Sequence, residues 1–534
     1  MNRWSEKKQK NRIKTQFGKN PMDMENWESL QLRMYEIEMY EQRRRKTFNQ
    51  EWVDDVTWND LEMDRVFARI NHTRTYMGEQ ILYHRLHGCK NRQKLQRMEK
   101  RIAFFSCQES SRIKVEEKLS HIGKQKENYY LPLFLMDEIN WPVTSCIGLY
   151  LQQVLLVICL AGTVLARSNV WGLGLLVVAT VNLLIYLHAK NKYEGNLFAV
   201  ANMKVALDFC NWMIKSFEGN QLYADEEILQ ALEKTRKLAK QMGRWQARKY
   251  QSVTGDLTGI VQDYLAGVTL YDIVAFCHIE KALRKCRKET LQLYEFVGDV
   301  DTDIAIASFR KSLTNWCSPM IQKSGSIRLE KICHPLMDDG VANSIELRKG
   351  AIFTGANASG KSTFMKAVAI NVILAQTIHT CVAKNVKMPT IKVMTSMALR
   401  DDVVQKESYY MREMKYLKRM LDEIEKGEPV LFVIDEILKG TNTRERLGAS
   451  KAILSYMAQK PGFLLVATHD LELVKAEEDL YETYYFDSQI CGKDIIFPDK
   501  MKQGIAVRTN AIDLMEMMDF PKEITDKARI VSAR

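Results

Sequence analysis

The residues best suited to chemistry form the phosphate-binding pattern G-x-x-x-x-G-K-[ST], made by Gly355, Gly360, Lys361 and Ser362. Glycines let the backbone approach phosphate oxygens closely, and the N-terminus of a following helix attracts their negative charge. In such loops the lysine contacts the terminal phosphates and the serine hydroxyl ligates Mg²⁺. The pattern therefore predicts a nucleotide site formed by Gly355, Ala356, Asn357, Ala358, Ser359, Gly360, Lys361, Ser362 and Thr363.

The sequence around the pattern predicts a strand before it and a helix after it. Residues 351–354 are apolar enough for a short buried strand. Beyond the loop, apolar residues recur at helical spacing, at Met365, Val368, Ala369, Val372 and Ile373. An ordinary glycine turn is the alternative, but it does not require either flanking element. The strand and helix therefore favour the nucleotide site.

Two carboxylates follow a second apolar strand at residues 430–434. Asp435, at the carboxyl end of this strand, is predicted to hold Mg²⁺ together with Ser362. Glu436 is placed to orient or deprotonate the attacking water. A third strand, residues 463–467, precedes His469, which is predicted to sense the γ-phosphate, with a structural histidine as the alternative. The expected catalytic residues are Lys361, Glu436 and His469.

The composition of the 534 residues is that of a globular chain, with 46% hydrophobic and 27% charged residues. The net charge of +11 permits an acidic partner, such as nucleic acid or an anionic membrane, although it also agrees with simple solubility. The 11 cysteines include no C-x-x-C pair, which argues against a zinc ribbon and fits reduced thiols facing the cytosol. The N-terminus lacks the apolar region of a cleaved signal peptide.

Two uncharged stretches, residues 143–166 and about 170–188, are separated by a short polar turn. At about 1.5 Å per residue, they span about 36 and 27 Å, enough to cross a hydrocarbon layer about 30 Å thick. Trp171 and Tyr186 lie near the ends of the second stretch, where interfacial aromatic residues are common. A buried helical hairpin in a soluble core is the alternative. Length and composition favour a transmembrane hairpin over residues 142–189.

The predicted nucleotide site fixes the orientation of this hairpin. A nucleotide-binding domain is expected to face the cytosol, so the short turn of the hairpin would lie outside. Both flanks of the hairpin must then lie on the same side. We therefore expect a two-pass protein of the cell membrane, in contact with membrane lipid, whose two termini and nucleotide-binding domain are cytoplasmic.

The rest of the chain divides by composition. Residues 1–50 form a basic N-terminal segment, for which a membrane or nucleic-acid contact and a solvated terminus are both open. Residues 51–141 and 190–325 have the helical spacing of packing or lever elements. From residue 326 to 534, short strands alternate with helices, which indicates an α/β domain.

Several motifs in this last part resemble those of the MutS family of ATPases. Residues 355–363 resemble its Walker A loop, residues 435–443 its Walker B strand and D-loop, and residues 467–469 its switch strand. Residues 408–414 resemble its signature helix, and residues 508–521 its C-terminal portion. The pattern that opens the family's ATPase domain is matched by His334, Pro335, Leu336 and Asn343. The resemblance covers about residues 326–534 and extends more weakly to the two helical regions.

The resemblance implies both a fold and a mechanism. The implied fold is multi-domain: an α-helical MutS core and lever region, interrupted by a transmembrane helical hairpin, followed by an α/β P-loop ATPase domain of the ABC type. ATP and Mg²⁺ are the implied cofactors. The implied assembly is a homodimer in which Ser408 completes the ATP site of the opposite subunit. Hydrolysis would open the dimer and move the lever helices, with DNA as the expected partner.

The chain also departs from the family pattern. It contains no Phe-x-Glu tripeptide and has no room for an N-terminal mismatch-reading domain, while Ala356 replaces the proline usual in the loop. These features resemble a membrane-bound branch of the family. They predict a membrane-anchored ATPase that acts on mismatched or branched DNA, as in DNA mismatch repair. The alternative is a membrane signalling or scaffolding switch that acts on protein partners without DNA. Half of a transporter fits less well, because two spans form no transport pathway.

Overall fold

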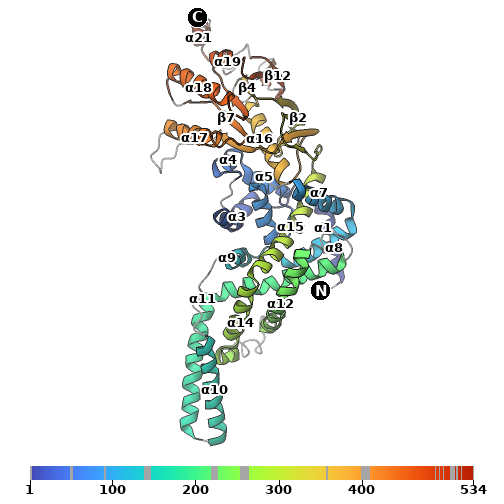
Figure 1. The fold of residues 1–534 in the computed structure, drawn as a ribbon, viewed down its shortest axis with the longest axis vertical. Helices are drawn as coiled ribbons and strands as arrows, with labels where there is room; N and C mark the ends of the chain where they lie inside the picture. Colours follow the sequence, from blue (N-terminus) through green and yellow to red (C-terminus); the bar gives the residue numbers. More distant parts are fainter. Residues whose placement is uncertain are drawn as a thin grey trace.

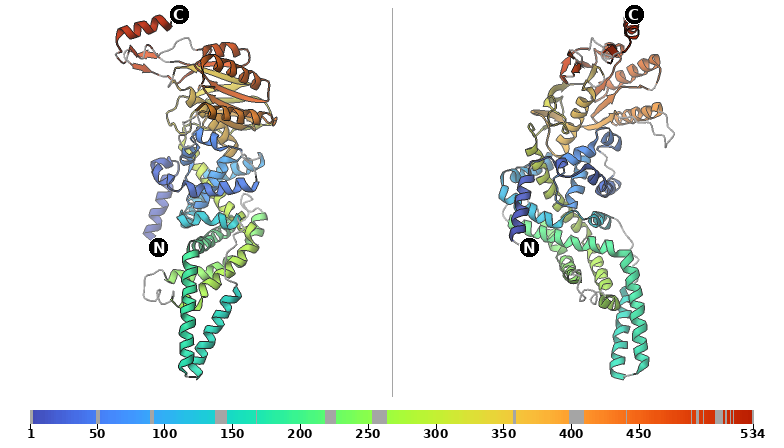
Figure 2. Two further views of the ribbon diagram at one scale, coloured as in Figure 1. Left: turned by 90° about the vertical axis from the view of Figure 1, so that its left-hand side faces the viewer. Right: turned by 180° about the vertical axis from the view of Figure 1, so that it is seen from behind.

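A computed structural model of the chain shows an elongated molecule, with a helical hairpin at one end and an α/β region at the other (Figure 1). It describes residues 3–48, 52–88, 92–136, 146–166, 168–217, 226–252, 264–356, 359–397, 409–439, 441–487, 489–491, 494–496, 498–505, 512, 515–516, 518 and 520–532. The two turned views show that the helical region lies between these ends (Figure 2).

The helical region is built around α15 (Arg287–Ser312), which packs against α6, α7 and α12. Thr75 joins the start of α6 to α15, because its hydroxyl accepts a hydrogen bond from the Gly78 N–H and donates one to Asp301 Oδ2 at 2.7 Å. The other helices are α1 (Arg3–Gln16), η1 (Pro21–Asp23), α2 (Trp27–Gln31), α3 (Met34–Phe48), α4 (Asp55–Asp60), α5 (Met63–Ile70), α6 (Tyr76–His87), α7 (Arg92–Cys107), α8 (Glu109–Ile122), η2 (Lys126–Tyr130), α9 (Leu131–Met136), α10 (Cys146–Ala166), α11 (Asn169–Ser216), α12 (Glu226–Ser252) and α14 (Tyr271–Lys285).

The basic N-terminal segment belongs to this helical region. Ile37 and Tyr40, on α3, are fully buried, and α3 packs against α6. Arg44 forms an ion pair of 2.5 Å with Glu295 of α15. Buried apolar side chains and paired charges are not features of a frayed end. A solvated terminus is therefore the wrong description of α3, whereas most described side chains of α1 are exposed.

Two of the helices are long and apolar enough to cross a membrane, over Ile147–Ala166 and Asn169–Ala189. Only 11% and 17% of their most apolar windows are buried, so these windows are mostly exposed on this chain. The second apolar stretch is not a separate helix, because α11 continues unbroken to Ser216. The expected boundary between hairpin and helical region, at residues 189 and 190, therefore falls inside one helix. Residues 142–145 of the expected hairpin lie outside the described residues.

The C-terminal α/β region contains a six-stranded sheet in the order β12-β9-β4-β8-β7-β6. Strands β9, β4, β8, β7 and β6 run parallel, and β12 pairs antiparallel with β9. Its elements are β4 (Gly350–Gly355), α16 (Lys361–Thr377), β6 (Lys392–Ser396), α17 (Tyr409–Ile424), β7 (Val430–Asp435), α18 (Thr443–Ala458), β8 (Gly462–Ala467), α19 (Leu471–Glu477), β9 (Glu482–Phe486) and β12 (Met501–Gln503). The chain continues to α21 (Lys522–Ser532).

Alternation along the strands gives the sheet two buried faces. On β7, Leu431 and Val433 join the large core that includes α16, whereas Phe432 and Ile434 join a second core with α17, α18 and α19. A parallel sheet covered by helices on both sides requires apolar residues at consecutive positions, as found here. This arrangement brings the carboxyl ends of β4, β7 and β8 to one edge of the sheet.

A second sheet, in the order β1-β5-β2-β3, lies beside α16. Its strands are β1 (Met320–Gln322), β2 (Ile327–Ile332), β3 (Asn343–Leu347) and β5 (Asn385–Pro389). Strand β1 begins six residues before the domain boundary expected at residue 326. A small antiparallel pair, β10 (Gln489–Cys491) and β11 (Asp494–Ile496), completes the described strands.

Polar contacts join the α/β region to the helical region. The buried Asp60 of α4 accepts hydrogen bonds from Thr395 Oγ1 at 2.7 Å and from the Met397 N–H at 2.9 Å, both at the end of β6. Near the end of α15, Arg310 donates hydrogen bonds of 2.9 Å to Thr380 Oγ1 and to the His379 carbonyl, just beyond α16. The helical region thus holds the sheet directly.

Candidate functional site

Two glycines shape the loop between β4 and α16. Gly355 has φ 138°, and a Cβ there would lie 2.5 Å from the carbonyl oxygen of Phe486. Gly360 has φ 95° and precedes α16, and a Cβ there would lie 2.6 Å from Asp499 Oδ1. Side chains are excluded at both positions by backbone conformation and by space. Only glycine lets the loop turn tightly from the strand into the helix.

Lys361 and Ser359 are buried beneath this loop, at 5% and 1% exposure. Lys361 Nζ donates hydrogen bonds to the carbonyl oxygens of Gly355 at 2.8 Å and Ala356 at 2.7 Å. Burial lowers the pKa of the Lys361 amine, although Asp435 and Glu436 oppose that shift. The Ser359 hydroxyl has no hydrogen-bond partner among the described residues. A buried hydroxyl without a partner is costly, so it marks a place for a polar ligand.

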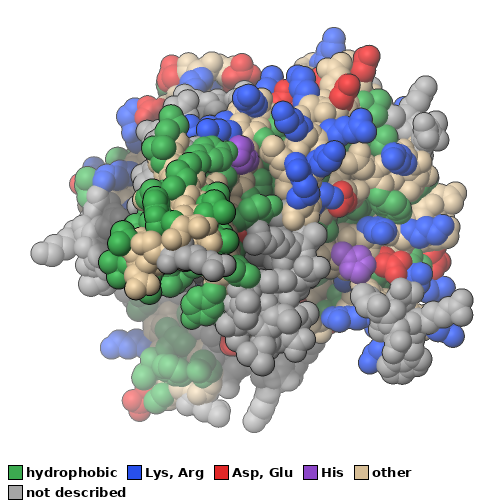
Figure 3. Space-filling model, turned by 90° about the horizontal axis from the view of Figure 1, so that it is seen from below, with side chains coloured by type: hydrophobic (Ala, Val, Ile, Leu, Met, Phe, Trp, Pro, Cys, Tyr) green, Lys and Arg blue, Asp and Glu red, His purple; other side chains and the backbone are tan. Residues whose placement is uncertain are grey.

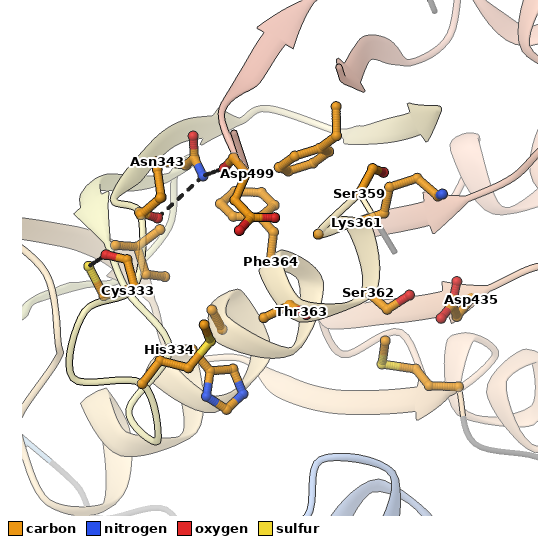
Figure 4. Close-up of a pocket in the computed structure, with 18 of the residues that line it drawn as sticks. Cys333, His334, Asn343, Ser359, Lys361, Ser362, Thr363, Phe364, Asp435 and Asp499 are labelled. Carbon is orange, nitrogen blue, oxygen red and sulfur yellow. Dashed lines mark hydrogen bonds between the residues drawn. The ribbon is translucent and has the colours of Figure 1, made fainter. Parts of the chain in front are cut away.

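Ser362 and Asp435 face each other between the start of α16 and the end of β7 (Figure 4). Burial raises the pKa of the Asp435 carboxyl, while the Ser362 hydroxyl and the Lys361 ammonium act in the opposite direction. Among the described residues, no group of three or more His, Cys, Asp and Glu could hold a metal ion alone. A hydroxyl and a carboxylate suit Mg²⁺, which keeps most of its other ligands as water or phosphate oxygens.

Glu436 follows with a left-handed backbone, φ 58°. Its carboxylate lies 3.2 Å from His469 Nε2 and 2.7 Å from Lys439 Nζ. The hydrogen bond from His469 and the charge of Lys439 lower the pKa of Glu436 to about 2, against the effect of burial. Strained backbones of this kind persist where surrounding contacts fix them, often at functional sites. The carboxylate is therefore ionised and held in place at neutral pH.

The turn that follows Glu436 is anchored from two other elements. The buried Glu413 of α17 accepts a hydrogen bond of 3.0 Å from the Lys439 N–H. Directly after β8, the Thr468 N–H donates a hydrogen bond of 3.0 Å to the Phe353 carbonyl of β4. This bond fixes the position of the next residue, His469, relative to β4. Three elements far apart in the sequence therefore position the carboxylate and the imidazole.

The opposite wall of the site comes from β3 and the segment before it. Asn343 Nδ2 donates to the Asp499 carbonyl at 2.8 Å, and its Oδ1 accepts from the Met501 N–H at 2.9 Å (Figure 4). Burial lowers the pKa of His334 to about 4, so this imidazole is neutral at physiological pH. The wall and the loop enclose a cavity of about 620 Å³, within the usual range for ligand sites.

The structure brings together most of the residues predicted from the sequence. The cavity is lined by Ser359, Gly360, Lys361, Ser362, Thr363, Asp435, Glu436 and His469, with Gly355 and Ala356 directly below. Asn357 and Ala358 of the predicted loop, and Ser408 of the predicted partner contact, lie outside the described residues.

Sequence reasoning missed several residues of this site. Asp499 and Phe486 come from the end of the chain, where no motif pointed to them. Lys439 was within the recognised turn, but only its charge and its spacing of three residues from Glu436 could have suggested the ion pair. Their contribution depends on tertiary contacts rather than on local spacing.

Comparison with known proteins identifies the C-terminal part. Residues 351–534 match the family described as MutS domain V. A protein of Natronomonas pharaonis named DNA mismatch repair protein MutS is 30% identical over 243 residues, which cover 43% of this chain and 28% of that protein. Proteins of the same name from Aquifex pyrophilus and Fusobacterium nucleatum are 26% identical over 263 residues and 31% identical over 251 residues. These two matches cover 46% and 44% of this chain, and 30% and 28% of the relatives.

The match thus spans less than a third of the length of the relatives. The sequence-based assignment of the C-terminal part to a known family is confirmed by this comparison. The coarse fold, a helical region followed by an α/β sheet region, is confirmed by the structure.

Replacing Gly355 by alanine should destabilise the protein, because the new Cβ meets the backbone oxygen of Phe486 and the φ of 138° is unfavourable for alanine. A strained position of this kind costs about 1–3 kcal/mol. Thermal unfolding of the purified protein should show a lower midpoint for Gly355→Ala than for the wild type.

The matched control is Gly448→Ala, on α18, where an added Cβ would have no neighbour within 4 Å. Alanine in a helix interior is favoured over glycine by about 0.5–1 kcal/mol. Its midpoint should equal or exceed that of the wild type. Equal midpoints for Gly355→Ala and the wild type would contradict the role given to Gly355.

Proposed function

The chain belongs to the MutS family, and from this premise we propose that it is a membrane-anchored ATPase that acts as a dimer. The observation that carries the proposal is the convergence of Lys361, Ser362, Asp435 and Glu436 on one cavity beside a glycine loop. These side chains have the chemistry needed for phosphoryl transfer to water.

The site fits a nucleoside triphosphate and Mg²⁺ by three properties. The loop excludes side chains at Gly355 and Gly360, which leaves its backbone accessible to phosphate oxygens. Among the described residues, the buried Ser359 hydroxyl has no hydrogen-bond partner. The Lys361 ammonium donates to two backbone carbonyls of the loop and can exchange these bonds for phosphate oxygens. The cavity of about 620 Å³ has space for a nucleotide.

Each side chain then has a distinct role. Lys361 stabilises negative charge on the transferred phosphoryl group, and Ser362 with Asp435 would hold Mg²⁺. When bound, Mg²⁺ would supply positive charge that offsets the charge of the phosphates. Because the pKa of Glu436 is about 2, its carboxylate is a weak base and is better suited to orient the attacking water than to remove its proton. His469 holds that carboxylate and lies where it can respond to the terminal phosphate.

The dimer is supported by the surface at the start of α17, the helix that follows Ser408 in the sequence. Tyr410, Met411 and Met414, on the first turns of α17, are all exposed, at 36%, 52% and 39%. Large apolar side chains grouped at one end of a helix favour contact with another protein surface. A second copy of the chain at this surface would bring its Ser408 toward the phosphates, as the family resemblance implies.

Membrane anchoring is supported by the hairpin α10–α11. Its two apolar stretches have mean hydropathies of 2.0 and 2.2 over 20 and 21 residues, and most of their side chains are exposed. Exposed apolar surface of this extent is unfavourable in water and favourable in a bilayer. With the ATP site in the cytoplasm, the turn between the helices lies on the outer side.

DNA is the proposed partner, since the relatives are named DNA mismatch repair proteins and the chain carries a net charge of +11. The competing proposal, a membrane scaffold that acts on proteins, rests on the same hairpin and does not require DNA. ATP hydrolysis is common to both proposals, so it is tested first.

The variant Glu436→Gln should lower kcat for ATP hydrolysis by about 10²-fold, the usual cost of misplacing a reacting group by about 1 Å. The neutral amide loses the ion pair with Lys439 and the charge that faces His469, so it no longer orients water in the same way. ATP affinity should remain close to that of the wild type. Phosphate release and fluorescent-nucleotide binding measure the two quantities.

Glu478→Gln is the matched control, because Glu478 is an exposed residue at the end of α19. It should hydrolyse ATP at the wild-type rate. Wild-type turnover by Glu436→Gln would show that this carboxylate is not part of the reaction.

A DNA-coupled ATPase should change its turnover when duplex, mismatched or branched DNA is added to the detergent-purified protein. The effect should fade with salt, since a protein with several phosphate contacts loses about 10³–10⁵ in DNA affinity between about 50 and 200 mM salt. A rate of ATP hydrolysis that no DNA changes, at either salt concentration, would favour the scaffold that acts on proteins.

A further inference from the structure

The two helices of the hairpin carry side-chain amides that bind a third segment of the chain. Asn182 Nδ2 of α11 donates a hydrogen bond of 2.8 Å to the carbonyl oxygen of Val268. Gln153 Nε2 of α10 donates a hydrogen bond of 2.8 Å to the carbonyl oxygen of Thr269. Two neighbouring carbonyls of one segment are thus satisfied by one amide from each helix.

These carbonyls are at the end of a helical turn, residues 264–269, where the chain changes direction. Leu270 has a left-handed backbone, φ 54°, and α14 begins at the next residue. The last carbonyls of a helix have no partner within the helix. In water they would be solvated, whereas in hydrocarbon each needs a protein donor. The amides of Gln153 and Asn182 supply those donors.

The contacts lie inside the apolar stretches of the hairpin. Gln153 is six residues from Ile147, and Asn182 is seven residues from Ala189, the ends of the two stretches nearest the helical region. At about 1.5 Å per residue, both amides lie about 9–10 Å inside those ends. For a hydrocarbon layer about 30 Å thick, this is about a third of the way across.

The segment packs closely against α11. A Cβ at Gly267 would lie 3.0 Å from Tyr186 Cδ1, which is tighter than side chains usually pack, so glycine favours this approach. Ala266 is 2% exposed, and Leu270 is buried in a small core with Leu149 and Tyr186. Small residues at such a contact are the usual way for helices to approach each other in a membrane.

The other side of the segment is exposed and apolar. Tyr264, Leu265 and Tyr271 are 61%, 56% and 46% exposed. The hairpin beside this segment also exposes apolar side chains, and Figure 3 shows hydrophobic side chains projecting toward the viewer. The Thr269 hydroxyl donates to the Leu265 carbonyl at 2.7 Å, so this polar group is also satisfied within the segment.

A basic stretch follows at the opposite end of α14. Residues 281–288 contain five Lys or Arg residues and no Asp or Glu. Lys281 is ten residues beyond Tyr271, or about 15 Å along a helix, which brings the stretch to the level of lipid headgroups. Figure 3 shows Lys and Arg side chains gathered on the face of the molecule beside the hairpin. The apolar residues 264–271 would match the acyl layer of an anionic leaflet, and the basic residues 281–288 would match its headgroup layer.

We propose that residues 264–271 are a third membrane-inserted element, which enters the cytoplasmic leaflet beside the hairpin and is held there by Gln153 and Asn182. Its partner is the acyl region of a phospholipid layer, contacted by Tyr264, Leu265 and Tyr271, with residues 281–288 at the headgroups. The inference rests on the proposed membrane anchoring through α10 and α11, but not on ATP hydrolysis. Through α14 and α15 it links the leaflet to the α/β region.

Photolabelling of the full-length protein in vesicles tests this insertion. The vesicles contain anionic phospholipid and a phosphatidylcholine with a diazirine in the middle of one acyl chain. After irradiation, peptide mass spectrometry should find lipid adducts on α10, on α11 and on residues 264–271, and none on the exposed Leu480 of the α/β region. Adducts on the hairpin without any on residues 264–271 would overturn the insertion. Adducts on neither would refute the membrane anchoring itself.

The double variant Gln153→Leu with Asn182→Leu tests the role of the amides. It leaves the carbonyls of Val268 and Thr269 without donors, and adducts on residues 264–271 should fall by about tenfold or more. The control Thr180→Leu changes an exposed polar residue of α11 whose hydroxyl bonds only within its own helix. It should leave the labelling unchanged. Wild-type labelling of residues 264–271 in the double variant would contradict the docking by the two amides.

Discussion

The burial of α16 is the constraint on which the rest of the structure depends. Its buried amides bind segments that form the site: Asn371 donates to the Cys333 carbonyl at 3.0 Å and accepts from the Val382 N–H at 2.6 Å. Gln376 exchanges two hydrogen bonds with Ile391, just before β6. Each of these groups would be costly if left unpaired in the core. Because the helix cannot move alone, the phosphate-binding loop at its start is fixed relative to both sheets.

The segment that follows α16 is also connected to the distant hairpin, through α15 and α14. Arg310, near the end of α15, donates to Thr380 Oγ1 at 2.9 Å and to the His379 carbonyl at 2.9 Å, directly beyond α16. At its other end α15 follows α14, whose first turns contact the hairpin. A change at the candidate site therefore has a continuous helical path toward the hairpin. In the proposed function, this path would carry the movement that ATP hydrolysis produces.

Local sequence predicted the parts of the site that depend on spacing, and missed those that depend on tertiary contacts. Glycine spacing and apolar strands located Lys361 and Asp435, because both follow directly from a strand–loop–helix order. The apolar residues expected at helical spacing on α16 are only part of its buried surface, since the helix is buried on nearly all sides between two sheets. Asp499 reaches the site through its contact with Asn343, across 156 residues, and no local pattern encodes that contact. Likewise, charge left open both a solvated N-terminal segment and a membrane or nucleic-acid contact, because the burial of Ile37 and Tyr40 arises only in the folded chain.

The central claim, an ATP site built from two copies of the chain, is tested most directly by mixing two inactive variants. Lys361→Ala lacks the phosphate contact of its own site, and Ser408→Ala lacks the group offered to its partner. Each variant alone should hydrolyse ATP at a background rate. Because a mixed dimer contains one site with both residues intact, co-expressed variants should recover a substantial part of the wild-type turnover. Background turnover in the mixed dimer, confirmed as a dimer by its two affinity tags, would contradict a site shared between subunits.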